Sequence, residues 1–157
     1  MARRFGLALA VVSVLVLGVT VMAADSNVGT WKLNLAKSKF NPGPAPKSQT
    51  LKIEAWGADG VKYTADGVDA DGKPTHWELQ AKYDGKFAPF KGNPDADMLA
   101  YKRIDANTVE ATTQLNGKPA GKTKVVVSAD GKTRTLTQTG KNAKGQTVNN
   151  VLVYDKQ

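Results

Sequence analysis

The chain has 157 residues, of which 41% are hydrophobic, and a formal net charge of +8 at pH 7. It contains no cysteine, which excludes disulfides, thiol nucleophiles and cysteine-ligated metals. Its lysines are spread over turns, for example the Asp-Gly-Lys triplets at 71–73, 84–86 and 130–132. Because a nucleic-acid-binding protein gathers its basic residues on one face, we expect no nucleic-acid partner.

Residues 1–23 have the pattern of a secretory signal peptide. Arg3 and Arg4 precede an apolar run, Phe5 to Val21, and a small-residue cleavage site follows at Ala23. A membrane anchor is the rival interpretation, since the run is nearly long enough to span a bilayer at about 17 residues. The cleavage site favours the signal peptide. We therefore expect a periplasmic or secreted protein with no membrane anchor after cleavage.

The remaining residues, 24–157, suffice for one domain, which we expect to be a β-barrel. No long stretch has helical periodicity, whereas short alternating segments recur with turn residues between them. The predicted strands are GTWKL at 29–33, QTLKIEAW at 49–56, VKYTADGV at 61–68, THWELQAKY at 75–83, DMLAYKRI at 97–104, TVEATTQL at 108–115, TKVVVSA at 123–129, RTLTQTG at 134–140 and VNNVLVYDK at 148–156.

The segment between the fourth and fifth of these strands, FAPFKGNPDAD, contains Pro89 and Pro94. Proline cannot donate to a ladder, so this segment can form only a short or edge strand. A meander of so many strands twists and must either close or expose long edges. We therefore predict an all-β fold, an antiparallel up-and-down meander closed into a small lipocalin-like barrel of 8–10 strands.

The two ends of the predicted barrel resemble a known superfamily. GTWKL at 29–33 resembles the Gly-x-Trp opening strand of the calycins, that is, the lipocalins and fatty-acid-binding proteins. VYDK at 153–156 and the strand led by Asp-Gly-Lys at 130–139 are similar to the closing strands of fatty-acid-binding proteins. The resemblance implies a structural role for Gly29 and Trp31.

In that superfamily the tryptophan plugs the closed end of the barrel, often beneath an arginine. A large aromatic side chain buries about 150–250 Å², which suits Trp31 to such a place. Arg103 and Arg134 are the two arginines that follow the signal peptide, so either could cover Trp31 through a cation–π contact. The sequence does not choose between them.

The chain departs from fatty-acid-binding proteins in two places. Where those proteins insert a helical lid after the first strand, this chain has Pro42, Pro44 and Pro46, which forbid a helix. We expect an extended loop there. The Arg-x-Tyr pair that grips a ligand carboxylate in many family members corresponds to Leu152 and Tyr154, so the fatty-acid clamp is incomplete.

The threonine-rich strands at 108–115 and 134–140 bear on the polarity of the barrel interior. Their alternation favours a partly polar interior that accepts a small amphipathic molecule. The alternative is that these threonines are strand formers on the solvent face. Aromatic side chains and one arginine could line the cavity, or the aromatics could simply form the core; these candidates are Tyr63, Trp77, Tyr101, Arg103 and Tyr154.

Catalytic and metal-binding patterns are weak. His76 is the single histidine and its predicted face is opposite that of Trp77, so we expect it to face solvent rather than to act in catalysis or to ligate haem. Asp69, Asp71 and Glu78 match part of a calcium loop, but the first ligand position lacks a side chain and a hairpin turn explains the pattern. We expect no enzyme, no metal and no cofactor.

Two hypotheses follow. The first is an exported, monomeric carrier of a small, partly hydrophobic molecule that binds inside the barrel. The second is an envelope or secreted interaction or inhibitor module with a filled barrel. An open cavity would favour the carrier. Exposed apolar residues such as Phe87 and Phe90 would favour the interaction module.

Overall fold

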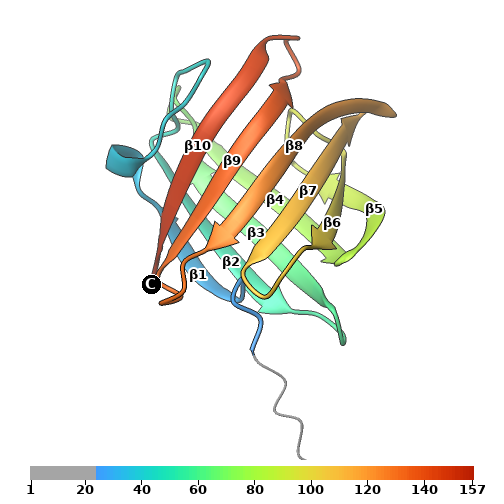
Figure 1. Ribbon diagram of the computed structural model, residues 1–157. Coiled ribbons are helices and arrows are strands. Elements are labelled where there is room, and N and C mark those ends of the chain that lie inside the picture. Colours follow the sequence, from blue (N-terminus) through green and yellow to red (C-terminus); the bar gives the residue numbers. More distant parts are fainter. Residues whose placement is uncertain (1–23) are drawn as a thin grey trace, which may run out of the picture.

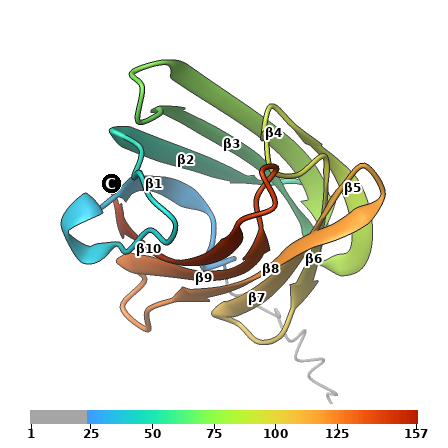
Figure 2. The same cartoon turned by 90° about the horizontal axis from the view of Figure 1, so that it is seen from above.

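A computed structural model describes residues 24–157, in which ten antiparallel strands form a closed barrel (Figures 1 and 2). The predicted signal peptide, residues 1–23, lies outside the described residues. The predicted all-β barrel is confirmed. The strands are β1 (Gly29–Leu33), β2 (Ser48–Ala55), β3 (Gly60–Val68), β4 (Pro74–Lys82), β5 (Asp84–Lys91), β6 (Met98–Arg103), β7 (Thr108–Leu115), β8 (Lys118–Val127), β9 (Thr133–Lys141) and β10 (Thr147–Lys156).

The strands form a simple meander. Each strand pairs with its neighbours in sequence, and β1 pairs with β10 to close the barrel. In this closing pair Trp31 lies opposite Lys156, and Leu33 lies opposite Tyr154. On its other side β1 pairs with β2, where Trp31 lies opposite Leu51. The Gly-x-Trp segment is therefore the strand that joins the two ends of the sheet.

The barrel is weakest between β4 and β5. Only two residue pairs join these strands, Glu78 with Lys91 and Leu79 with Phe90. Immediately before Phe90 in β5 lies Pro89, which cannot donate a ladder hydrogen bond. Along its other edge, β5 pairs with β6 from Asp84 onward. The proline-containing segment is thus an edge toward β4, as expected.

The connection from β1 to β2 is extended, as its prolines predict. Within residues 34–47 the only helix is one 3-10 turn, η1 (Leu35–Lys37). Lys39 then forms an isolated bridge with Val151 of β10, and Phe40 packs against the core. The connection is therefore held against β10 rather than folded into a helix pair.

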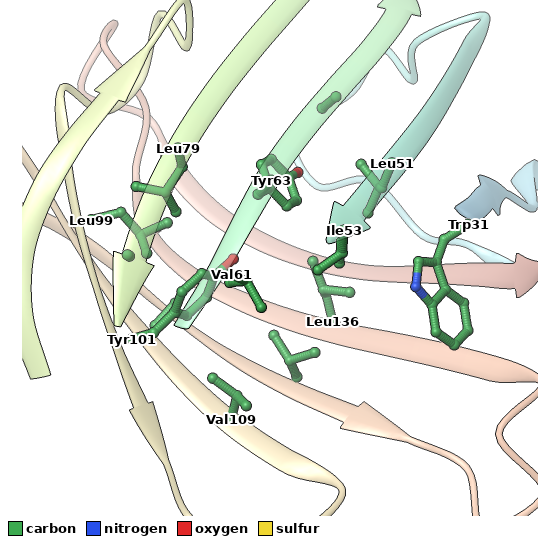
Figure 3. Close-up of a cluster of buried hydrophobic side chains, with 14 of the residues drawn as sticks. Trp31, Leu51, Ile53, Val61, Tyr63, Leu79, Leu99, Tyr101, Val109 and Leu136 are labelled. Atoms are coloured by element: carbon green, nitrogen blue, oxygen red, sulfur yellow. The ribbon is translucent and has the colours of Figure 1, made fainter. Parts of the chain in front are cut away.

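The inward side chains fall into two halves along the barrel axis. In β9, Arg134 and Leu136 are buried but Gln138 is only half-buried, and in β4 Leu79 is buried but Trp77 is half-buried. The same division recurs in β7, β8 and β10. We call the buried half, next to residues 25–28, the floor half, and the other the mouth half. Figure 3 shows the floor-half cluster.

The inward residues of the mouth half are partly exposed to solvent. Aliphatic and aromatic side chains fill the floor half, whereas smaller and more polar side chains line the mouth half. The half-buried inward residues there are Thr75, Trp77, Thr113, Thr123, Gln138 and Asn150.

Trp31 should make the largest single contribution to the stability of the floor half. Its side chain is fully buried, and its indole Nε1 donates a hydrogen bond to the Asn27 carbonyl at 2.9 Å. We expect Trp31→Ala to lower the free energy of unfolding by about 3–5 kcal/mol. Trp56, 41% exposed, is the matched control, and Trp56→Ala should cost less than about 1 kcal/mol. Urea denaturation followed by far-UV circular dichroism measures both; equal losses would contradict the assignment.

Candidate functional site: the barrel interior

An aromatic series runs from the mouth half toward the floor half. The Trp77 and Phe90 rings meet edge to face, with 6.1 Å between centroids, and Phe90 meets Tyr63 in the same way at 6.1 Å. Such pairs stabilise beyond the area they bury. Trp77 is the half-buried member, so it offers an apolar face to a molecule that enters the mouth half. Tyr63 and Phe90 form the apolar base beneath it.

Three of the predicted ligand-binding tyrosines are buried in the interior. Tyr63 and Tyr101 project into the barrel (Figure 3), and Tyr154 donates a hydrogen bond from its hydroxyl to Oε1 of Gln49. Burial raises the pKa of all three phenols, so the hydroxyls stay neutral across the physiological range. The structure therefore brings Tyr63, Trp77, Tyr101 and Tyr154 together inside the barrel.

Several uncharged polar side chains face the interior in the mouth half. Asn150 and Gln138 are cross-strand partners whose side-chain amides hydrogen-bond at 3.3 Å. Thr113 and Thr123 face inward on β7 and β8. The threonines of β9 alternate with the inward residues and lie on the outer face, namely Thr133, Thr135, Thr137 and Thr139. On β7 the threonines divide, since Thr113 faces inward whereas Thr112 lies on the outer face.

Arg134 is a buried cation within the floor half. It is 2% exposed, its Nε lies 3.5 Å from Oδ1 of Asn27, and its Nη1 has no hydrogen-bond partner among residues 24–157. A void of about 10 Å³ adjoins the guanidinium, between Tyr63 and Tyr101. That size is at the lower limit for one water molecule, which could hydrogen-bond the free nitrogen.

The strands place no carboxylate inside the barrel opposite this cation. All acidic residues of β1–β10 lie outside the inward-facing sets; they are Glu54, Asp66, Glu78, Asp84, Glu110 and Asp155. Charges act over longer distances in a desolvated interior than in water. Arg134 is therefore a buried positive charge that no inward carboxylate of the strands compensates.

The residues that precede β1 seal the floor. Oδ2 of Asp25 accepts hydrogen bonds from the Tyr83 hydroxyl at 2.8 Å and from Nη2 of Arg103 at 3.0 Å. Burial raises the pKa of Asp25, but the hydrogen bonds from Arg103, the Asn27 amide and Tyr83 outweigh it and leave the pKa below its usual value. Ser26 adds a hydrogen bond to the Ala106 carbonyl. These contacts join the chain before β1 to the opposite side of the barrel.

Arg103 lies in this floor seal, apart from the four aromatic residues. Its guanidinium lies 3.9 Å from the Tyr83 ring centroid, over the ring. The cation above the Trp31 ring is Lys156, at 5.1 Å, so the expected arginine over Trp31 was wrong. Lys156 reaches the ring because it is the direct cross-strand partner of Trp31.

The position of Arg134 bears on the incomplete fatty-acid clamp. Leu152 is buried where that motif has its arginine, but Arg134 of β9 lies directly opposite Tyr154. Arg134 and Tyr154 are therefore neighbours on two adjacent strands, whereas the Arg-x-Tyr motif has both residues on one strand. From the sequence, Arg134 was expected only as a possible cover for Trp31; the register of the β9–β10 hairpin places it opposite Tyr154 instead.

His76 lies on the outer surface, as expected. Its Nδ1 is 2.6 Å from Oδ1 of Asp66 and its Nε2 is 3.4 Å from Oε1 of Glu78, and hydrogen bonds to these carboxylates raise the pKa of the imidazole. In the turn that partly matches a calcium loop, Asp69 accepts a hydrogen bond from the Lys73 amide. Among residues 24–157, no group of three or more His, Asp or Glu side chains is placed to hold a metal.

Within the same residues, no helix is both long and apolar enough to cross a membrane.

Comparisons with known proteins identify the fold. No family model matches the chain, and no curated protein matches it. The crystal structure of wild-type fluorescent protein UnaG matches with a TM-score of 0.57 and 17% identity, over 84% of this chain and 98% of that one. Zebrafish ileal bile acid-binding protein complexed with cholic acid matches with a TM-score of 0.50 and 11% identity, over 84% and 99%. The chain therefore shares the fold of these two proteins, and its own barrel has ten antiparallel strands. The predicted resemblance to fatty-acid-binding proteins is thereby confirmed at the level of the fold.

The Asp25 carboxylate should make the stability of the barrel depend on pH. An aspartate in the unfolded chain titrates near pH 3.9, and the folded-state pKa of Asp25 is lower. Its charge therefore stabilises the fold above about pH 4, and this contribution is lost as the pH falls through the folded-state pKa.

We expect Asp25→Asn to be about 1–2 kcal/mol less stable than wild type at pH 7, with the difference becoming smaller as the pH falls toward the folded-state pKa of Asp25. Asp59, which is 63% exposed and lies 3.6 Å from the same arginine, is the control, and Asp59→Asn should have little effect. Urea denaturation at pH 7, 5 and 3 measures both variants. A difference for Asp25→Asn that does not change with pH would refute the assignment.

Proposed function

We propose that this protein is a non-catalytic, exported binding protein for a small, partly apolar molecule that carries a negative charge. The observation that carries the proposal is the charge of the interior. Arg134 is buried there, and no strand carboxylate faces it. An uncompensated buried charge is costly, and an anionic ligand in the same low-dielectric space would offset that cost.

The mouth half is the expected place of binding. Trp77 and Phe90 supply an apolar wall, while Thr123, Gln138 and Asn150 supply hydrogen-bonding groups. Small-molecule sites typically combine a mostly apolar lining with a few polar groups in this way. The zebrafish protein of the same fold was crystallised with cholic acid, and that likeness supports an acidic, amphipathic ligand here.

The interior offers a binding surface rather than catalytic machinery. His76 is on the outer surface, and the buried tyrosines are held neutral. General acid–base catalysis requires a titratable group near neutral pH in contact with the ligand. This supports binding without chemical conversion.

An interaction module with a filled barrel is the less supported alternative. Phe87 is 39% exposed, but Phe90 is buried between Tyr63 and Trp77. The apolar surface that the alternative requires is therefore smaller than the sequence suggested.

A fluorescent amphipathic acid tests the proposed site. We expect 11-(dansylamino)undecanoic acid to bind with a blue-shifted emission and its methyl ester to bind less tightly. Arg134→Met should weaken binding of the acid by about five- to thirtyfold, which corresponds to about 1–2 kcal/mol of lost electrostatic attraction. The ester should be unaffected. Titration of dansyl fluorescence measures all four affinities.

Two controls accompany that titration. Trp77→Ala should weaken both the acid and the ester, because it removes the apolar wall, whereas Val126→Ala, at an exposed position of β8, should leave both unchanged. Replacement of a buried charge by a hydrophobic residue is often neutral or stabilising, so Arg134→Met should unfold at the same urea concentration as wild type or at a higher one. Absence of binding by either probe would refute the carrier, and an equal loss for acid and ester would refute the charge argument.

Export is tested separately. With the full chain expressed in a Gram-negative host, we expect the periplasmic fraction to contain a protein whose intact mass corresponds to residues 24–157. Intact-mass spectrometry of the periplasmic and membrane fractions measures this. Uncleaved chain confined to the membrane fraction would contradict the proposal and support the anchor.

A further inference from the structure

A cleft on the outside of the barrel lies where β4 and β5 separate. Its volume is about 400 Å³, within the range of about 300–1,000 Å³ found for small-molecule sites. It differs from the interior site because outward-facing residues of β3 and β4 form much of its wall. The lining residues are Trp56, Lys62, Tyr63, Glu78, Leu79, Gln80, Pro89 and Lys91.

The cleft follows from the end of the β4–β5 ladder. Pairing stops at Leu79 and Phe90, and Pro89 then lies on the β5 side of the opening. The Tyr83 amide donates to the Asp59 carbonyl on the β3 side. Because backbone groups alternate along an antiparallel strand, Gln80 presents its amide and carbonyl toward β5, where no ladder residue meets it. Backbone hydrogen-bonding groups therefore border the cleft.

One wall of the cleft is an exposed aromatic ring in a fixed position. Trp56 is 41% exposed, and its backbone amide donates to the Gly60 carbonyl at 2.8 Å. A Cβ on Gly60 would lie 3.1 Å from the indole and 2.8 Å from the Trp56 carbonyl. The absence of a side chain at Gly60 thus allows the indole to pack closely against the strand and leaves its other side open to the cleft.

The lining of the cleft carries two lysines, Lys62 and Lys91, and one carboxylate, Glu78, which gives it a formal net charge of +1. Neither Lys62 nor Lys91 has a carboxylate oxygen within 4.0 Å among residues 24–157. The acidic residue beside Lys62 on β2, Glu54, is bound by Lys52 at 3.1 Å. The cross-strand partner of Lys91, Glu78, lies 3.4 Å from His76. Two lysines therefore border the cleft with their charges uncompensated by a close ion pair.

We propose that this cleft is a second ligand site, for a flat aromatic anion. The aromatic part would stack on Trp56, and the acid group would lie between the ammonium groups of Lys62 and Lys91. The exposed indole matches the aromatic part of such a ligand. The two lysines and the backbone groups that border the cleft match its acid group. The site does not depend on the interior function, because its charged and stacking groups face outward.

The indole N–H resonances of the three tryptophans separate the two sites. Trp56 reports on the cleft, Trp77 on the mouth half, and buried Trp31 on the floor half. We expect naphthalene-2-sulfonate, titrated into ¹⁵N-labelled protein, to shift the Trp56 indole resonance saturably while the Trp31 resonance stays in place. Single Trp→Phe variants assign the three resonances.

Charge-matched variants test the anion requirement. Lys62→Gln combined with Lys91→Gln should weaken the effect on Trp56 by about fivefold or more. Lys122→Gln combined with Lys124→Gln, on the outer face of β8, should leave it unchanged. The neutral analogue 2-(hydroxymethyl)naphthalene should bind more weakly than the sulfonate to the wild-type protein. If the Lys62/Lys91 variant and the Lys122/Lys124 variant lose the same amount of affinity for naphthalene-2-sulfonate, the proposal is overturned.

The outcomes distinguish this proposal from the proposed function. If the Trp56 resonance does not move while Trp77 shifts, the cleft is not a site and the interior function stands. If Trp56 shifts while the interior probes fail to bind, the cleft proposal stands without the carrier. A shift of Trp56 that persists in Trp77→Ala supports an independent outer site.

Discussion

The burial of Trp31 at the seam of the barrel is the interaction on which the rest of the structure depends. β1 is short, yet it joins β2 to β10 and so closes the sheet. Its tryptophan lies between Leu51 and Lys156 and binds the Asn27 carbonyl through the indole. With no disulfide available, packing and hydrogen bonds alone must hold this closure. The segment that precedes β1 then becomes the floor.

Above this floor, the inward side chains of the mouth half are only partly buried. Most strands place their two floor-side inward residues in one continuous core, and burial of apolar area stabilises by about 25 cal/mol per Å². The mouth half gives up part of that burial, since Thr113, Gln138 and Asn150 face inward there. A barrel that is well packed at one end can thus keep a partly polar, solvent-accessible space at the other.

Sequence patterns predicted the strands well because side-chain alternation is a local property. The alternation in β4 placed Trp77 and Leu79 inward and His76 outward, and the prolines of residues 42–46 correctly excluded a lid. The cations could not be placed in the same way. Whether a lysine or an arginine lies over Trp31 depends on the register of β1 against β10, two segments at opposite ends of the chain. Arg134 was likewise located by its partner on β10, not by its own strand.

Arg134 shows how a cost in stability can indicate a function. Its guanidinium is buried, has one long hydrogen bond to Asn27, and lacks a carboxylate partner among the strands. A hydrophobic side chain of similar size would fill the same space without desolvating a charge. The neighbouring phenols of Tyr63 and Tyr101 are neutral, so they do not balance its charge. This unbalanced charge is the basis of the anionic ligand proposed above, since a potential acts on another charge without direct contact.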